Sequence, residues 1–286
     1  MILVTGAGGK TGKAVLKALV ARGEAVRAFV RSAAHHAALK AIGVHNVELG
    51  EMDDPRAWSQ AIRGTSAVYH ICPNVNPHEL PFAKALVAAA GTHGIRRFVY
   101  HSVLHPQIEA MPHHWAKLRV EEMLFSSGLD VTILQPTAYM QNSLAEWDRM
   151  VADGIYRVPY PVETKLSLVD LDDVAEAAAL VLTEDGHSGA TYELAGTPPM
   201  SQIEIAETFG HALRRAVRAE ADPVEVWTQR ARGAAMDDTQ LETLAKMFQA
   251  YARDGLKGNP NVLGWLLKRP PTSLAAFAAR MAAAHA

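Results

Sequence analysis

The sequence predicts an α/β protein built on a doubly wound parallel sheet, and three observations indicate this fold. The first half of the chain alternates short, apolar, β-rich runs with helical stretches, the pattern of repeated β-α-β units. A glycine-rich turn joins the first such run, residues 2–4, to a helical stretch. At 286 residues, the chain is long enough for a full hydrophobic core in one large or two modest domains.

Each element follows from its local residue pattern. Strands are expected where apolar and β-branched residues gather between turn signals, at 2–4, 25–30, 45–49, 67–72, 97–101, 131–135 and 166–169. Helices are expected over the alanine-rich and capped stretches 11–22, 55–63, 81–91, 112–126, 170–182, 201–216, 223–231, 237–253 and 273–284. Residues 156–161 are a loop or a short strand, and 191–194 form a strand that rejoins the main sheet.

The change of pattern near residue 150 divides the chain into two domains. We expect a Rossmann-type nucleotide-binding domain over 1–150 and a smaller, mostly helical substrate domain over 151–286. Because strands of the second half return to the main sheet, the smaller domain is interleaved with the first rather than appended to it.

The turn after the first strand predicts a dinucleotide site. Gly6, Gly9 and Gly12 fit the spacing GxxGxxG, whereas GxGxxG fails because position 11 is threonine. Glycines let the backbone approach a pyrophosphate, and the amides and dipole at a helix N-terminus favour its negative charge. The alternative is a tight turn between a strand and a helix that binds nothing.

The end of the second strand predicts which dinucleotide binds. An NAD site would carry an acidic residue about 20 residues after the glycines, to accept a hydrogen bond from the ribose 2′-hydroxyl. This chain has Arg31 and Ser32 there instead. A guanidinium can hold a 2′-phosphate with charge-assisted hydrogen bonds, so the sequence favours NADP(H).

Composition excludes several classes of protein. The 28 basic and 30 acidic residues are nearly balanced and form no basic tract, so we expect neither a nucleic-acid partner nor a membrane partner. The single cysteine, Cys72, allows no internal disulfide and is typical of a cytoplasmic protein. No stretch resembles a signal peptide or a membrane span, and no histidine or acidic cluster has metal-ligand spacing. The sequence leaves a homodimer open.

The chain resembles the NmrA-like group of atypical short-chain dehydrogenase/reductases over nearly its whole length. The resemblance rests on VTGAGGKTG at 4–12, FVRS at 29–32, FVYHSVLH at 98–105, HHWAKLRVEEML at 113–124, LQPTAYMQN at 134–142 and SLVDLDDVAEAA at 167–178. It implies that the glycine loop cradles the pyrophosphate through Thr5, Gly6, Gly8, Gly9, Lys10, Thr11 and Gly12. It also implies that Arg31 contacts the adenosine phosphate, and that Glu51 and Met52 lie at the adenine. For the other half of the cofactor, it implies contacts from Cys72 and Pro73 to the ribose, from Lys117 to the nicotinamide ribose, and from Pro136 and Thr137 to the nicotinamide.

One departure from that family bears on catalysis. Classical members carry a proton-donating tyrosine four residues before the lysine, where this chain has His113. His113 and Lys117 share a helical face, so the histidine is a candidate acid, although an ordinary histidine near a helix start is the alternative. Ser102 follows a strand directly and could polarise a substrate carbonyl or simply cap a turn.

The candidate substrate pocket predicts the class of reaction. The residues close to the expected pocket are His105, Trp115, Tyr139, Met140, Asn142 and Trp147. If two of them face the cleft, the pocket is apolar and aromatic, whereas tryptophans at such positions are more often part of the core. Hydride transfer to a quinone-like or otherwise stabilised acceptor needs little acid catalysis, so the sequence favours an NADPH-dependent reductase of a small aromatic or conjugated carbonyl-type substrate. A non-catalytic NADP(H) sensor that binds a protein partner is the rival reading. A nucleotide-sugar epimerase or dehydratase fits less well.

Overall fold

The computed structural model describes residues 1–232 and 236–285. The chain forms two compact units, each assembled from separate segments. The first, here called the sheet unit, comprises Met1–Gln107, His113–Gln135 and Val174–Tyr192. The second, here called the C-terminal unit, comprises Ile108–Pro112, Pro136–Asp173 and Glu193–Ala286. No helix among the described residues is long and apolar enough to cross a membrane.

A seven-stranded sheet in the order β10-β6-β5-β4-β1-β2-β3 forms the centre of the sheet unit. Neighbouring strands from β6 to β3 pair in parallel, with Ile2 opposite both Val26 and Ala67. This confirms the doubly wound α/β fold. The strands are β1 (Ile2–Val4), β2 (Val26–Val30), β3 (Val47–Leu49), β4 (Ala67–His70), β5 (Arg97–His101), β6 (Val131–Pro136) and β10 (Thr191–Leu194).

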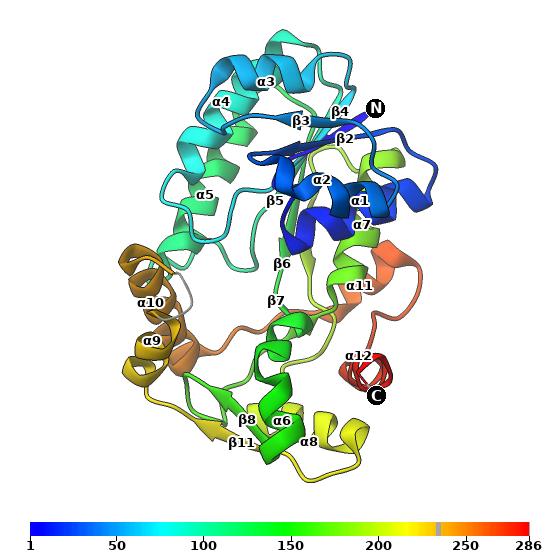
Figure 1. The fold of residues 1–286 in the computed structure, drawn as a ribbon. Helices are drawn as coiled ribbons and strands as arrows, with labels where there is room; N and C mark the ends of the chain where they lie inside the picture. Colours follow the sequence, from blue (N-terminus) through cyan, green and yellow to red (C-terminus); the bar gives the residue numbers. More distant parts are fainter. Residues whose placement is uncertain (233–235, 286) are drawn as a thin grey trace. The chain divides into compact units, whose positions relative to one another are not determined.

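Helices cover both faces of this sheet (Figure 1). On one face lie α3 (Pro55–Ile62), α4 (Glu79–Thr92) and α5 (Pro112–Phe125). The other face carries α1 (Lys10–Ala21) and the part of α7 (Leu171–Thr183) that belongs to the sheet unit. The short helix α2 (His36–Ala41) lies between β2 and β3 in the chain. Trp58 of α3 stacks on Phe29 of β2, with ring centroids 4.4 Å apart, in the core between the sheet and α3–α5.

Two helix boundaries show where local patterns mislead. Helix α4 begins at Glu79, two residues before Pro81, because a proline in the first turn lacks only an amide that has no intrahelical partner there. The short α2, with the sequence HAALKA, was not expected from the residue pattern.

The C-terminal unit is mostly helical, as the sequence predicts. It contains α6 (Trp147–Asp153), α8 (Gln202–Leu213), α9 (Val224–Arg232), α10 (Asp238–Asp254), α11 (Pro260–Leu267) and α12 (Leu274–Ala284). Two small parallel pairs accompany them: β7 (Ala138–Tyr139) with β9 (Leu168–Val169), and β8 (Ile155–Val158) with β11 (Arg218–Ala221). The sequence did not predict α6, α11 or β11, which are short and flanked by glycine or proline.

Two buried carboxylates hold the C-terminal unit together. Asp170 accepts hydrogen bonds from the Arg280 guanidinium at 2.6 Å and the Gln141 side chain at 2.7 Å. Asp173 accepts from the Arg269 guanidinium at 2.7 Å and the Thr272 amide at 2.6 Å. The sequence predicts these acids as helix caps, and the amide of Asp172 does donate to Asp170 at 3.1 Å. Their larger role is to anchor the last helices of the chain.

Candidate active site

The glycine loop connects the end of β1 to the start of α1. Gly9 is the N-cap residue of α1, with an extended backbone (φ −78°, ψ 169°), and no side chain caps the helix. Its amide donates to the Gly6 carbonyl at 3.0 Å, which closes the turn. A twelve-residue helix that begins without a side-chain cap presents backbone amides and a positive dipole end, the arrangement that binds phosphate groups.

The three glycines of the motif serve different needs. Gly6 has a left-handed backbone (φ 56°), and a Cβ there would lie 2.8 Å from Ile71 Cγ2. A Cβ on Gly12 would lie 2.4 Å from the Gly6 carbonyl oxygen. Gly6 and Gly12 are therefore required by the fold of the loop itself. A Cβ on Gly9 would meet only the Gly6 oxygen, at 3.3 Å, so the fold does not demand glycine there. The loop therefore fits a pyrophosphate, whose close approach would require glycine at position 9.

Thr5 ties the loop to the neighbouring strand. Its hydroxyl donates to the Ile71 carbonyl at 3.0 Å and accepts from the Ile71 amide at 2.9 Å. The same oxygen lies 3.0 Å from His70 Nδ1. Because Thr5 is fully buried, its side chain fixes the ends of β1 and β4 relative to each other. Its place among the cofactor contacts stays a prediction.

The residues expected at the adenosine end lie after β2 and β3. Arg31 directly follows β2 and is exposed, and among the described residues no carboxylate pairs with its guanidinium. The His35 ring lies against Gly8, where a Cβ would come within 2.6 Å of Nε2. Glu51 is exposed, whereas Met52 is buried in the core and its carbonyl accepts from Trp58 Nε1 at 2.8 Å. An exposed arginine at this strand end is available to a 2′-phosphate.

A buried ionic cluster surrounds Lys117. Its ammonium donates to Glu79 Oε1 at 2.9 Å and to the His101 carbonyl at 3.3 Å. The Tyr100 hydroxyl donates to the same Glu79 oxygen at 2.8 Å. Glu79 is 3% exposed, in the first turn of α4. Sequence reasoning missed it because the helix was expected to begin at Pro81, which left Glu79 in a loop, where an acid is ordinarily solvated.

Cys72 and Pro73, expected beside the cofactor ribose, follow β4. The Cys72 thiol is buried and free of any disulfide. Burial, and then the nearby Glu79 carboxylate, raise its pKa well above the ordinary thiol value, so it stays protonated. The protonated thiol therefore acts as a small, buried apolar group near the Glu79 carboxylate.

His113 and His114 begin α5 with their rings 4.5 Å apart. The pKa of His113 is lowered to about 3, mainly by burial and in smaller part by the nearby His114 and Lys117. The Nδ1 atom of His113 is buried and has no hydrogen-bond partner within the described part of the chain. His114 Nδ1 donates to the carbonyl of His105, a residue with a left-handed backbone (φ 54°), at 3.4 Å. At neutral pH, His113 is therefore uncharged and carries no imidazolium proton to deliver.

Ser102 belongs to a second buried polar group. Its hydroxyl donates to Glu121 Oε1, and the Gln135 amide donates to both Glu121 oxygens, at 2.9 and 3.0 Å. Burial raises the pKa of Glu121 above its usual range, although both hydrogen-bond partners oppose the shift. Ser102 thus neither caps a turn nor points its hydrogen at solvent. Its role toward a substrate stays a prediction.

The other expected contacts belong to the C-terminal unit. The Thr137 hydroxyl donates to the Ser167 carbonyl at 2.8 Å, next to Pro136 at the end of β6. Tyr139 is half-buried, Met140 is fully buried and Asn142 is exposed. The sheet unit therefore contains Gly9, Arg31 and Lys117. The C-terminal unit contains the candidate pocket residues Tyr139, Met140, Asn142 and Trp147.

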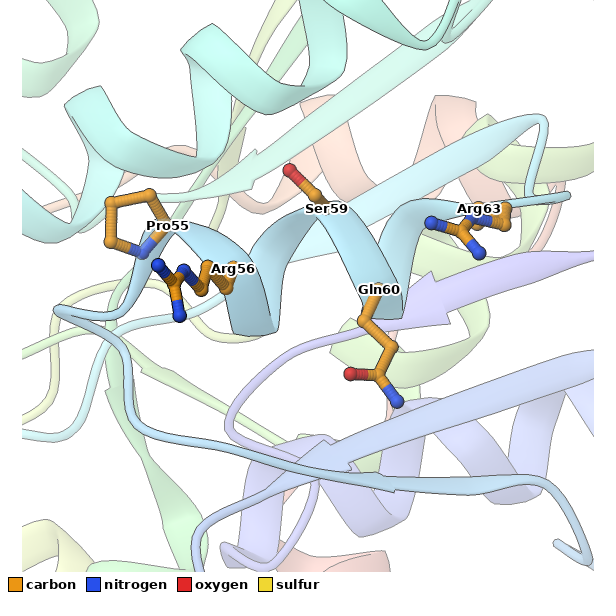
Figure 2. Close-up of a pocket in the computed structure, with 5 residues that line it drawn as sticks. All are labelled: Pro55, Arg56, Ser59, Gln60 and Arg63. Atoms are coloured by element: carbon orange, nitrogen blue, oxygen red, sulfur yellow. The ribbon is translucent and has the colours of Figure 1, made fainter.

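A surface depression on α3 offers no competing site. Figure 2 shows its lining residues, Pro55, Arg56, Ser59, Gln60 and Arg63, strung along one helix rather than converging on a point. Their spacing places them on the solvent side of α3, opposite Trp58 and the core.

Comparison with known proteins decides the family. The profile of the NmrA-like family matches residues 1–272. The chain belongs to the NmrA-like family. This NmrA-like chain is 29% identical over 286 residues to an NAD(P)H azoreductase of Xenophilus azovorans, covering 99% of both chains. It is 27% identical over 281 residues to quinone oxidoreductase 2 of Escherichia coli (strain K12), covering 96% of each.

A solved structure supports the same placement of the NmrA-like chain. The structure of an NADPH-dependent quinone oxidoreductase from Escherichia coli, complexed with NADPH, matches with a TM-score of 0.86 at 25% identity. The match covers 98% of this chain and 99% of that one. The resemblance seen in the sequence motifs therefore extends over the whole NmrA-like fold.

Proposed function

We propose that this NmrA-like protein is an NADPH-dependent reductase that transfers hydride to a small aromatic or conjugated carbonyl-type substrate, such as a quinone. The observation that carries the proposal is the glycine loop at the uncapped start of α1, where a Cβ on residue 9 would meet only the Gly6 oxygen, at 3.3 Å. The exposed Arg31 at the end of β2 adds the preference for the 2′-phosphate. The named azoreductase and quinone oxidoreductase support the same chemistry.

The residues of the chain bind and orient, and NADPH supplies the hydride when bound. The glycine loop holds the pyrophosphate, and Lys117 holds the nicotinamide ribose. His113 stands where a tyrosine would donate a proton, but burial keeps it neutral. A substrate whose reduced form is already a stabilised anion, such as a quinol phenolate, needs no such donor. The neutral His113 therefore favours quinone-like acceptors over simple aldehydes and ketones.

The test is NADPH oxidation measured against a panel of quinones, azo compounds, enones, aldehydes and imines. We expect turnover with quinones and other conjugated acceptors, and little with simple aldehydes. Gly9→Val is the matched control, since a protein that cannot bind the cofactor must lose turnover with every acceptor. A blank panel together with tight NADPH binding would overturn the proposal, and would instead favour an NADP(H) sensor that binds a protein partner.

We also propose a cytoplasmic setting and a homodimeric state, with no nucleic-acid partner. The single cysteine, free and buried, is typical of a reducing compartment. The near balance of 28 basic and 30 acidic residues opposes binding to nucleic acid. Light scattering coupled to size-exclusion chromatography tests the dimer, and a monomer mass across the concentration range would refute it.

A further inference from the structure

We propose that Glu79 is a positioning residue that fixes the Lys117 ammonium for its contact with the nicotinamide ribose. The inference rests on the proposed function, because it assumes that NADPH binds along the glycine loop and reaches Lys117. It adds a residue that neither the sequence motifs nor the family resemblance indicates. Three features of the buried cluster support it: the donors of Lys117, the burial of Glu79, and the partners that Glu79 shares.

The donors of Lys117 are mostly committed to the protein. An ammonium has three N–H donors. One is directed at Glu79 Oε1 at 2.9 Å and another at the His101 carbonyl at 3.3 Å. The nitrogen also lies 5.4 Å from the centroid of the Tyr100 ring, within the range of a cation–π interaction. These contacts from α4 and β5 hold the ammonium in one place and leave one N–H for a further acceptor.

The burial of Glu79 shows that the pair is more than a surface ion pair. Its side chain is 4% exposed, and that of Lys117 is 13% exposed. A buried carboxylate is costly unless its charge is balanced and its oxygens accept hydrogen bonds. Lys117 supplies the charge, and the Tyr100 hydroxyl donates at 2.8 Å. Removing the carboxylate would leave the lysine without a counter-charge, and the side chain would turn toward water.

Glu79 also joins two of the expected cofactor contacts. Its carboxylate accepts a hydrogen bond from Lys117 and lies close enough to Cys72 to raise the pKa of that thiol. Cys72 follows β4, where the cofactor ribose is expected. Glu79 is the first residue of α4, so this helix start connects the segment after β4 to the lysine of α5. A substitution at Glu79 should therefore weaken binding of the nicotinamide half of the cofactor and leave binding of its adenosine half unchanged.

The experiment compares two ligands on three single variants and one double variant. Calorimetry measures the Kd of NADPH and of 2′,5′-ADP, which has the adenosine phosphates but no nicotinamide ribose. We expect Glu79→Gln to raise the Kd of NADPH about tenfold, since one charge-assisted hydrogen bond contributes on this scale. The Kd of 2′,5′-ADP should stay within about twofold of the wild-type value. Lys117→Met should weaken NADPH at least as much, and adding Glu79→Gln to it should have little further effect. Tyr100→Phe keeps the ion pair and should leave both affinities within about twofold.

A purely structural role would give a different result. Equal weakening of both ligands by Glu79→Gln, or unchanged NADPH affinity in the folded variant, would overturn the inference. Full additivity with Lys117→Met would do the same. If Glu79→Gln does not fold, Glu79→Asp draws the carboxylate back by one methylene and should show the same selective loss. A wild-type protein that fails to bind NADPH would instead refute the proposed function.

Discussion

Replacing Gly9 by valine separates the ligand requirement of the loop from its folding requirement. The backbone at Gly9 is extended (φ −78°), which any residue adopts, and a Cβ there meets only the Gly6 oxygen at 3.3 Å. Valine is a poorer N-cap than glycine by up to about 1 kcal/mol. In a protein of this size, that loss lowers Tm by about 2–4 °C. Circular dichroism should therefore show a folded Gly9→Val protein.

Binding should respond far more strongly than folding. The valine methyl groups would occupy the space through which the pyrophosphate approaches the α1 amides, so we expect at least about a 100-fold loss of NADPH affinity, or about 2.7 kcal/mol. Calorimetry on wild type and Gly9→Val measures this directly. Gly12→Ala is the contrasting control, because its Cβ would lie 2.4 Å from the Gly6 oxygen and should lower Tm more than Gly9→Val does. A folded Gly9→Val protein with wild-type affinity would refute the placement of the cofactor.

Four further expectations concern cofactor choice, catalysis and stability. NADPH should bind at least about tenfold tighter than NADH, and Arg31→Ala should weaken only NADPH; equal affinities in the wild type would contradict this. Because the pKa of His113 is lowered to about 3, kcat with a quinone should not change between pH 6 and 8. The His113→Ala variant should have nearly the same kcat. A large, pH-dependent loss of kcat in this variant would show that His113 delivers a proton. Four buried histidines, His70, His101, His113 and His114, have pKa values of about 3 to 4, below the ~6.5 of an unfolded histidine. The folded state therefore binds fewer protons than the unfolded state, and stability is lost as the pH falls from ~6.5 toward 4. A constant Tm over this range would argue against the burial of these histidines. Asp173→Asn should lower the free energy of unfolding by about 1–3 kcal/mol in urea titrations, because the amide cannot accept all the hydrogen bonds that the carboxylate accepts from Arg269 and Thr272. A loss below about 0.5 kcal/mol would show that these contacts are dispensable.

Local sequence pattern determined the fold class and predicts the cofactor end of the site. Buried parallel strands are short apolar runs, and helices between them carry their own caps and breakers, so β1, β5 and β6 lie where the sequence predicts them. The glycine loop and Arg31 could be predicted as cofactor contacts because both belong to one contiguous β-α-β unit. Their chemistry depends on neighbours in the chain, which a sequence displays directly.

Tertiary structure alone decided the state of the groups near the expected nicotinamide end. Glu79 meets Lys117 across 38 positions of sequence, and Asp173 meets Arg269 across 96. The same holds for His113, a plausible acid by its position in the motif, because only its burial makes it neutral. Burial and long-range partners set the charge of an ionisable group, and neither can be predicted from its neighbours in the sequence.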